Sequence, residues 1–143
     1  ADFEINVLGA IKVIKNYFLK LKRSQSGSIV LFSSVAVNQG MPFHSSIATS
    51  KGGIEGLTKS LAAELAPKIR VNCISPTLTN TDLAKKFLRN EQALENISNR
   101  HPLKKICEPK NISSMVNYLL TDDADKIPGQ IFNIDSGMSS IKL

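Results

Sequence analysis

The stretch Ser28-Ile29-Val30-Leu31-Phe32-Ser33 decides the fold class of this 143-residue chain. Its four consecutive large apolar residues include two β-branched ones, and such runs favour a strand over a short helix. Because polar residues do not alternate with the apolar ones, the strand is expected to be buried on both faces. Strands of that kind are typical of a parallel sheet covered by helices.

Helical and strand patterns alternate along the rest of the chain. Apolar residues recur at helical spacing from Phe3 to Arg23, ahead of the turn Ser24-Gln25-Ser26-Gly27. A second helix runs from about Ser46 to Ala66, where Pro67 ends it. The order predicts an α/β fold with a parallel sheet and right-handed crossovers. The remaining expected elements are a strand Ile69–Ser75, a helix Asp82–Ser98, a helix Pro109–Leu120 and a strand Gln130–Asp135.

No repeat or linker divides residues 1–143, so the chain is expected to form a single domain. Three strands are few for a parallel sheet, and the first one would leave an apolar edge open. Open apolar edges are sites of unwanted pairing. Two explanations stay open: another chain covers the edge, or the domain continues in sequence outside this chain.

The composition limits the classes of partner. The formal net charge is +6, and the first helix carries a cluster of cations. A solvated helix face is the ordinary explanation, and an anion-attracting surface is the alternative. Only Tyr17 and Phe18 stand among these charges, which is too few aromatic residues for a platform that stacks single-stranded bases, so no nucleic-acid partner is expected. No apolar run is long enough to span a bilayer, so no membrane partner is expected. The cluster consists of Lys12, Lys15, Lys20, Lys22 and Arg23.

The two cysteines and the N-terminus indicate a cytoplasmic protein. Cys73 and Cys107 are isolated and lack the spacing of metal ligands, so both are expected to be reduced thiols, and no metal is expected. Cys73 is expected to be a small core residue. The first residues hold no basic region followed by an apolar stretch, as a signal peptide would.

Five stretches stand out, in order along the chain: Asn6-Val7-Leu8-Gly9, Ile29 to Ser34, Ser50 to Thr58, Ile69 to Asn72 with Pro76 and Thr81, and Pro128 to Gln130 with Asp135 to Gly137. Together, and at matching distances, they resemble the short-chain dehydrogenase/reductase family. The resemblance implies the C-terminal part of a doubly wound Rossmann-type parallel sheet. It also implies an oxidoreductase that uses NAD or NADP on a small carbonyl or alcohol.

The resemblance assigns roles to particular residues. Ser34 would hydrogen-bond the substrate oxygen, although a serine at a strand end can instead satisfy local backbone. Lys51 would bind the nicotinamide ribose and supply positive charge, and Asn6 would position Lys51 through a water. Pro76 and Thr81 belong to the loop beside the nicotinamide, and Thr81 could also cap a helix beginning near Asp82.

The chain departs from the family's pattern at its central acid. The family's tyrosine, four residues before the lysine, is replaced by Ile47, which has no exchangeable proton. His44, three residues earlier, is the candidate substitute, because imidazole can act as a general acid near neutral pH. A histidine at the rim of a pocket is the plainer interpretation. The departure keeps a second function open, a catalytically silent member that serves binding or assembly.

Other departures concern the cofactor. No Gly-x-x-x-Gly-x-Gly turn appears, so the chain is expected to lack the N-terminal half that cradles the cofactor diphosphate. Thr77 and Ser136 stand where the family has glycine.

The resemblance also implies a homodimer or homotetramer formed through the two long helices. A line of small residues, Ala48, Gly52 and Gly56, would permit close approach of a second copy.

Overall fold

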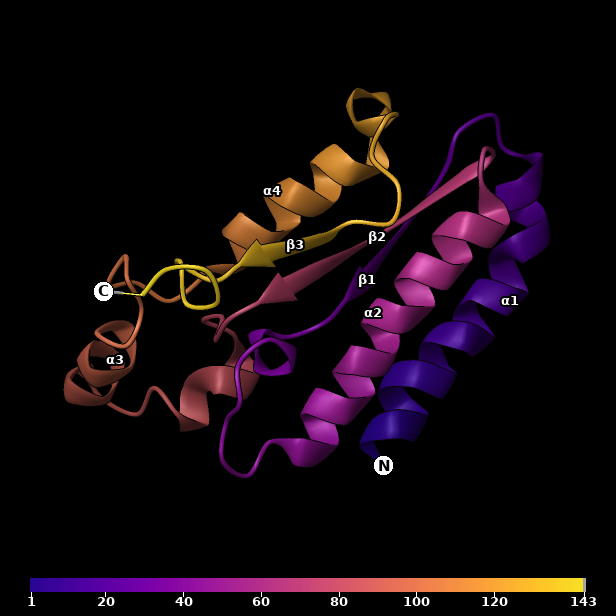
Figure 1. Cartoon of the computed structure of the whole chain (residues 1–143). Helices are drawn as coiled ribbons and strands as arrows, with labels where there is room; N and C mark the ends of the chain where they lie inside the picture. Colours follow the sequence, from indigo (N-terminus) through magenta and orange to yellow (C-terminus); the bar gives the residue numbers. More distant parts are fainter. Residues whose placement is uncertain (143) are drawn as a thin grey trace.

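Three parallel strands form one sheet in the order β1-β2-β3 (Figure 1). They are β1 (Gly27–Phe32), β2 (Ile69–Pro76) and β3 (Ile131–Ile134) in a computed structural model that describes residues 1–142. The register pairs Gly27 with Ile69 at one end of β1 and Phe32 with Ile74 at the other. The expected α/β fold with three parallel strands is therefore confirmed.

Helices cover both faces of the sheet (Figure 1). On one face lie α1 (Gly9–Arg23) and α2 (Ser45–Leu65), and on the other lies α4 (Pro109–Leu120). The eight-residue α3 (Glu91–Ser98) lies beyond the carboxyl ends of the strands. Short helical turns connect these elements: η1 (Glu4–Leu8), η2 (Val35–Val37), η3 (Asp82–Lys86) and η4 (Asp122–Ala124).

The central strand β2 separates two apolar clusters. Alternate side chains of a strand point to opposite faces. Ile69, Val71 and Cys73 accordingly pack with residues of α2 such as Ile54, whereas Ile74 packs with Leu119 of α4. Burial on both faces of the sheet also explains why β1 carries an unbroken apolar run.

Two polar side chains on the α4 face of β2 are buried with their partners. The Arg70 guanidinium donates to the Leu119 carbonyl at 2.9 Å and to the Thr121 carbonyl at 3.1 Å, at the negative end of the α4 dipole. The Asn72 amide donates to the Ile127 carbonyl at 2.6 Å and accepts from the Gln130 amide at 3.0 Å. These bonds satisfy buried polar groups and fix the path from α4 to β3.

The structure corrects two helix expectations. The helix expected from Asp82 to Ser98 is two elements, η3 and α3. The Asn90 side chain accepts from the Ala93 amide at 2.8 Å, a cap that starts a new helix at Glu91. The first expected helix opens with a π-helical segment, η1, before α1 begins at Gly9.

Cys73 generates a prediction about alkaline stability. Its side chain is fully buried, and burial raises the pKa of the thiol from 9.0 to about 11. Between these values the folded state keeps a proton that the unfolded state has lost. Stability is therefore unaffected below pH 9 and falls as the pH rises toward 11, by about 2–3 kcal/mol in all.

We expect Cys73→Val and Cys73→Ala to lack this part of the alkaline loss, measured as the change in unfolding free energy between pH 8 and pH 10.5. The alanine variant should be less stable than the valine variant at every pH because it leaves a cavity. If both variants lost as much stability as the parent chain over this interval, the buried thiol would not be the cause.

Candidate active site

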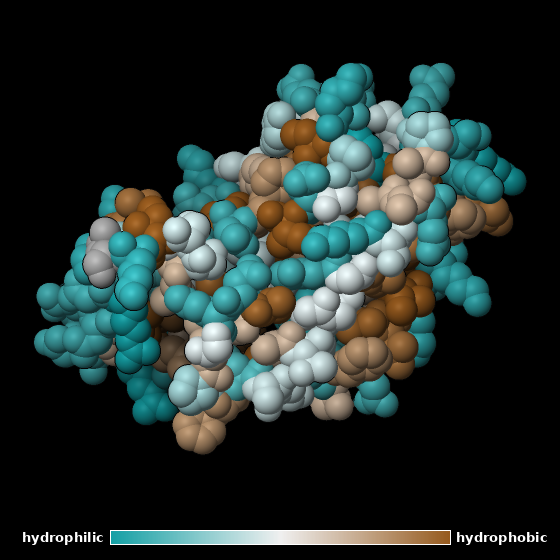
Figure 2. Space-filling view, viewed as in Figure 1, coloured by the Kyte–Doolittle hydropathy of each residue, from teal (hydrophilic) through white to brown (hydrophobic). Residues whose placement is uncertain are grey.

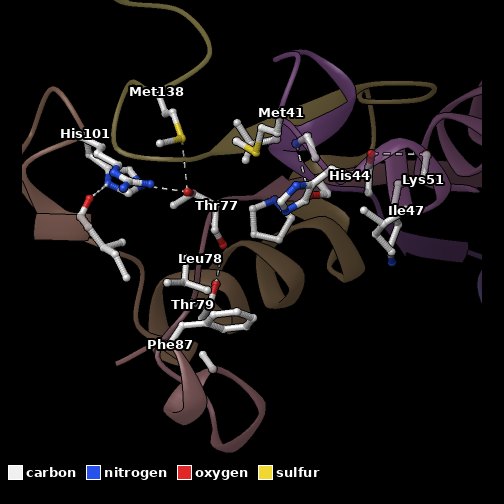
Figure 3. Close-up of a pocket in the computed structure, with 18 of the residues that line it drawn as sticks. Met41, His44, Ile47, Lys51, Thr77, Leu78, Thr79, Phe87, His101 and Met138 are labelled. Carbon is white, nitrogen blue, oxygen red and sulfur yellow. Dashed lines mark hydrogen bonds between the residues drawn. The ribbon is translucent and has the colours of Figure 1, made fainter. Parts of the chain in front are cut away.

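A cavity of about 600 Å³ lies at the carboxyl ends of β1 and β2 (Figure 3). Its walls come from the β1–α2 connection, the start of α2, the long β2–α4 connection and the segment that follows β3. Apolar side chains such as Leu83, Phe87 and Met138 supply most of the lining. None of the lining residues is acidic, whereas Lys51 and Arg100 are cations, so the electrostatics favour a neutral or anionic ligand.

Ile47 and Lys51 reach the cavity from successive turns of α2. Residues four apart share a helix face, and both side chains line the cavity. The Lys51 Nζ donates to the Phe32 carbonyl at 2.9 Å. An ammonium has three hydrogens, so two stay available to a ligand. Burial lowers the pKa of Lys51 from its ordinary value.

Ser34 follows β1 and lines the same cavity. Its Oγ accepts from the Ala36 amide at 3.2 Å and so caps the short helix η2. This is the local backbone role that the sequence left open. The bond uses the oxygen as an acceptor, so the hydroxyl hydrogen can still be donated to a substrate oxygen. The two roles are compatible.

Asn6 lies in η1 and is not among the residues that line the cavity. Its Nδ2 donates to the Ser50 Oγ at 3.2 Å, and that hydroxyl donates to the Ile47 carbonyl at 3.0 Å. The structure thus joins Asn6 to the neighbour of Lys51 in sequence. Asn6 therefore binds the first turns of α2 through Ser50, and its side chain does not line the cavity.

Pro76 and Thr81 both line the cavity, on the loop that leaves β2. Thr81 stands at the N-cap position of η3, but its side chain makes no capping hydrogen bond. Thr81 is thus the N-cap residue in position, as predicted, without a capping bond from its hydroxyl, and the residue is exposed.

His44 precedes α2 and also lines the cavity. Its Nδ1 lies 2.7 Å from the Pro42 carbonyl. Because a carbonyl only accepts, Nδ1 carries a hydrogen and donates it. The other nitrogen, Nε2, then has a free lone pair and accepts in the neutral ring, whereas it carries a hydrogen and donates in the imidazolium. A proton released by His44 would therefore leave from Nε2.

Thr77 and His101 form a buried pair at the cavity that the sequence did not identify (Figure 3). Thr77 was noted as a replacement for glycine, and His101 fell between the two helices predicted from Asp82 to Ser98 and from Pro109 to Leu120. The Thr77 Oγ1 and His101 Nε2 lie 2.8 Å apart, and His101 Nδ1 lies 3.0 Å from the Ile97 carbonyl. No motif spacing marks this histidine, since its partner comes from another segment.

Metal-ligating and membrane features were also sought within residues 1–142. No group of three or more His, Cys, Asp or Glu side chains there could hold a metal ion. None of the helices described is both long and apolar enough to cross a bilayer.

Comparison with known proteins identifies the family. Residues 1–139 match the family model described as enoyl-(acyl carrier protein) reductase. The chain is 32% identical over 139 residues to the 3-oxoacyl-(acyl-carrier-protein) reductase FabG of Thermotoga maritima, a match that covers 96% of this chain and 56% of that reductase.

Solved structures agree with the sequence match. A short-chain type dehydrogenase/reductase from Mycobacterium ulcerans superposes with a TM-score of 0.88 at 28% identity, covering 96% of this chain and 50% of that one. ElxO with NADP bound superposes with a TM-score of 0.87 at 28% identity, covering 95% of this chain and 56% of that one.

The chain belongs to the short-chain dehydrogenase/reductase family. It spans about half the length of the relatives it matches. Relatives in the family include oxidoreductases, and one of the matched structures holds NADP.

Proposed function

We propose that the protein containing this chain is an NAD(P)-dependent oxidoreductase that acts on a small carbonyl or alcohol, with a non-standard proton donor. One observation carries the proposal. Ser34 and Lys51 line one cavity at the carboxyl ends of parallel strands, each with hydrogens left to donate. That is where α/β sheets bind their ligands.

The residues present fit the nicotinamide end of a dinucleotide. Lys51 would donate to ribose hydroxyls, while Pro76 and Thr81 would border the ring. The bound nicotinamide would supply or accept the hydride. The lack of acidic side chains in the lining suits a ligand that carries phosphates. The choice between NAD and NADP is open, because the residues that contact the other end of the cofactor are not in this cavity.

The chain's own groups would handle the charge and the proton. The Ser34 hydroxyl would hydrogen-bond the substrate carbonyl oxygen, and the Lys51 ammonium would stabilise the negative charge that develops there during reduction. A proton must then reach that oxygen. The His44 imidazolium would donate it from Nε2, since Nδ1 is held by the Pro42 carbonyl.

One observation favours a second function. Ile47 occupies the helix position from which the family's tyrosine acts, and its side chain has no proton to give. A catalytically silent member would keep the fold and cavity for binding or for assembly with a related subunit. An oxidoreductase needs Ser34 and Lys51 placed so that they can act on a substrate, whereas a silent member does not. Restoring a hydroxyl at position 47 therefore distinguishes the two functions.

We expect Ile47→Tyr to raise or create carbonyl-reductase activity toward small ketones in the full-length protein that contains this chain. The new hydroxyl would enter the cavity one helical turn before Lys51, whose charge favours the phenolate. The measurement is the rate of nicotinamide oxidation over a panel of ketones.

Ile47→Phe is the matched control, because it adds the ring without the hydroxyl. A gain confined to the tyrosine variant would show that Ser34 and Lys51 are in working geometry. A tyrosine variant that folds and binds cofactor but reduces no ketone faster than the phenylalanine variant would favour the silent-member function.

We expect His44→Ala to lower turnover of the native substrate about a hundredfold, the usual scale for loss of a general acid. The pH–rate profile should lose its histidine limb at the same time. Lys51 and Ser34 are unchanged in this variant, so cofactor affinity should be preserved. An unaltered profile would leave His44 as a residue of the cavity rim.

We further propose that this protein forms a homodimer or homotetramer through α1 and α2. Figure 2 shows a pale band along α2 with apolar side chains beside it over α1. Large apolar residues are exposed along this N-terminal helical segment, including Phe3, Ile5 and Leu8 ahead of α1 and Ile11 within it. A second copy related by a two-fold axis would cover them, and two-fold dimers are the commonest assemblies.

Gly56→Leu should weaken such assembly without unfolding the chain. A Cβ at Gly56 would meet no atom within 4 Å, so a clash arises only if another copy packs there. Gly53→Leu is the control for fold damage, since a Cβ there lies 3.2 Å from Val7 Cγ2 within the chain. Sedimentation velocity should show a larger monomer fraction for Gly56→Leu than for the parent. Thermal melting should show a lower melting temperature for Gly53→Leu alone. A monomeric parent protein would contradict the proposal.

A further inference from the structure

The Thr77–His101 pair lies almost entirely out of solvent. His101 is 1% exposed and Thr77 is 7% exposed, and both line the cavity. Both ring nitrogens have partners: Nδ1 at 3.0 Å from the Ile97 carbonyl, and Nε2 at 2.8 Å from the Thr77 Oγ1. The imidazole therefore holds the threonine hydroxyl in one orientation.

Counting hydrogens fixes what Thr77 presents to a ligand. A carbonyl only accepts, so Nδ1 of His101 carries the hydrogen in that bond. In the neutral ring Nε2 then carries no hydrogen and can only accept, so the Thr77 hydroxyl must donate to it. The hydroxyl has one hydrogen, so the Met138 sulfur, 3.6 Å away, cannot receive it at the same time. Thr77 Oγ1 is left as an acceptor only.

The fold does not need this hydroxyl to hold the loop. The Thr77 amide donates to the Ile134 carbonyl at 3.1 Å, and the Thr79 hydroxyl donates to the Thr77 carbonyl at 3.0 Å. The backbone is thus fixed by other bonds. Met138, whose sulfur lies 3.6 Å from the hydroxyl oxygen, has no hydrogen to donate. The strong donors of the cavity lining, Lys51 and Arg100, make no hydrogen bond to this oxygen within the part of the chain that the structure describes.

We propose that the Thr77–His101 pair is a specificity element that selects ligands carrying an O–H or N–H donor, such as hydroxylated carbonyl compounds, over simple ketones and ethers. The inference rests on the proposed function, since it treats this cavity as the substrate site. A fixed acceptor among apolar groups discriminates strongly, because a ligand without a donor leaves it unpaired. Thr77 and His101 act in recognition and need not touch the reacting carbon.

The test uses three probe sets that differ in one group: cyclohexanone, its 2-, 3- and 4-hydroxy derivatives, and the corresponding methoxy derivatives. A methoxy oxygen accepts but does not donate. Dissociation constants are measured at pH 8, where imidazole is ordinarily neutral, by ligand-observed NMR competition in the full-length protein that contains this chain. This readout requires no turnover.

At least one hydroxy isomer should bind about tenfold more tightly than its methoxy counterpart, the difference that one hydrogen bond makes. Thr77→Val, which keeps the shape and removes the oxygen, should bring that ratio to about one, while Thr77→Ser should retain it. His101→Phe should lower the ratio with Thr77 intact, because the freed hydroxyl can then donate to a methoxy oxygen.

Equal binding of hydroxy and methoxy probes by the parent protein would overturn the inference, as would a preference that survives in Thr77→Val. Circular dichroism identifies a variant that has not folded. If His101→Phe does not fold, the contrast between Thr77→Val and Thr77→Ser still decides the question. Nicotinamide binding, followed by fluorescence in the same samples, distinguishes this failure from failure of the proposed function. A protein that binds cofactor but shows no hydroxyl preference would retain the function and lose the specificity element.

Discussion

The parallel pairing of β2 with a strand on each side is the constraint on which the rest of this structure depends. Parallel strands all end at the same edge of a sheet, so the segments that leave β1 and β2 must emerge side by side. Ser34 and Thr77 come close only for that reason, although they are far apart in sequence. β2 is itself buried on both faces, which holds this edge of the sheet between the helices.

Buried polar bonds connect that sheet to the helices that carry the site. Arg70 joins β2 to the end of α4, and Asn72 joins it to the segment leading to β3. On the other face, the Ser33 hydroxyl donates to Glu55 of α2 at 2.6 Å. Leaving such groups unpaired in the core would cost more than the bonds contribute. The register of α2 against β1, and with it the direction of Lys51, is therefore strongly specified.

Local pattern predicted much of this fold from the sequence, for reasons that can be named. Apolar runs and helical spacing depend only on neighbours along the chain, so all three strands and the helix from Pro109 to Leu120 were predicted within a residue at each end. The break at Asn90 was missed because its cap lies inside an otherwise helical pattern. In the site, motif spacing identified Ser34 and Lys51 as candidates. His101 could not be found in this way, since its bond to Thr77 depends on where two separate loops meet.

Lys51 is oriented by the main-chain carbonyl of Phe32, an acceptor that no substitution at that position removes except by disturbing the strand itself. The cation is therefore inherited with the backbone, independently of what stands at position 47. A lineage can lose the tyrosine and drift while the electrostatic half of the site stays intact. In evolutionary terms, a new proton donor could therefore arise by substitution near Lys51 without a new cation having to arise at the same time.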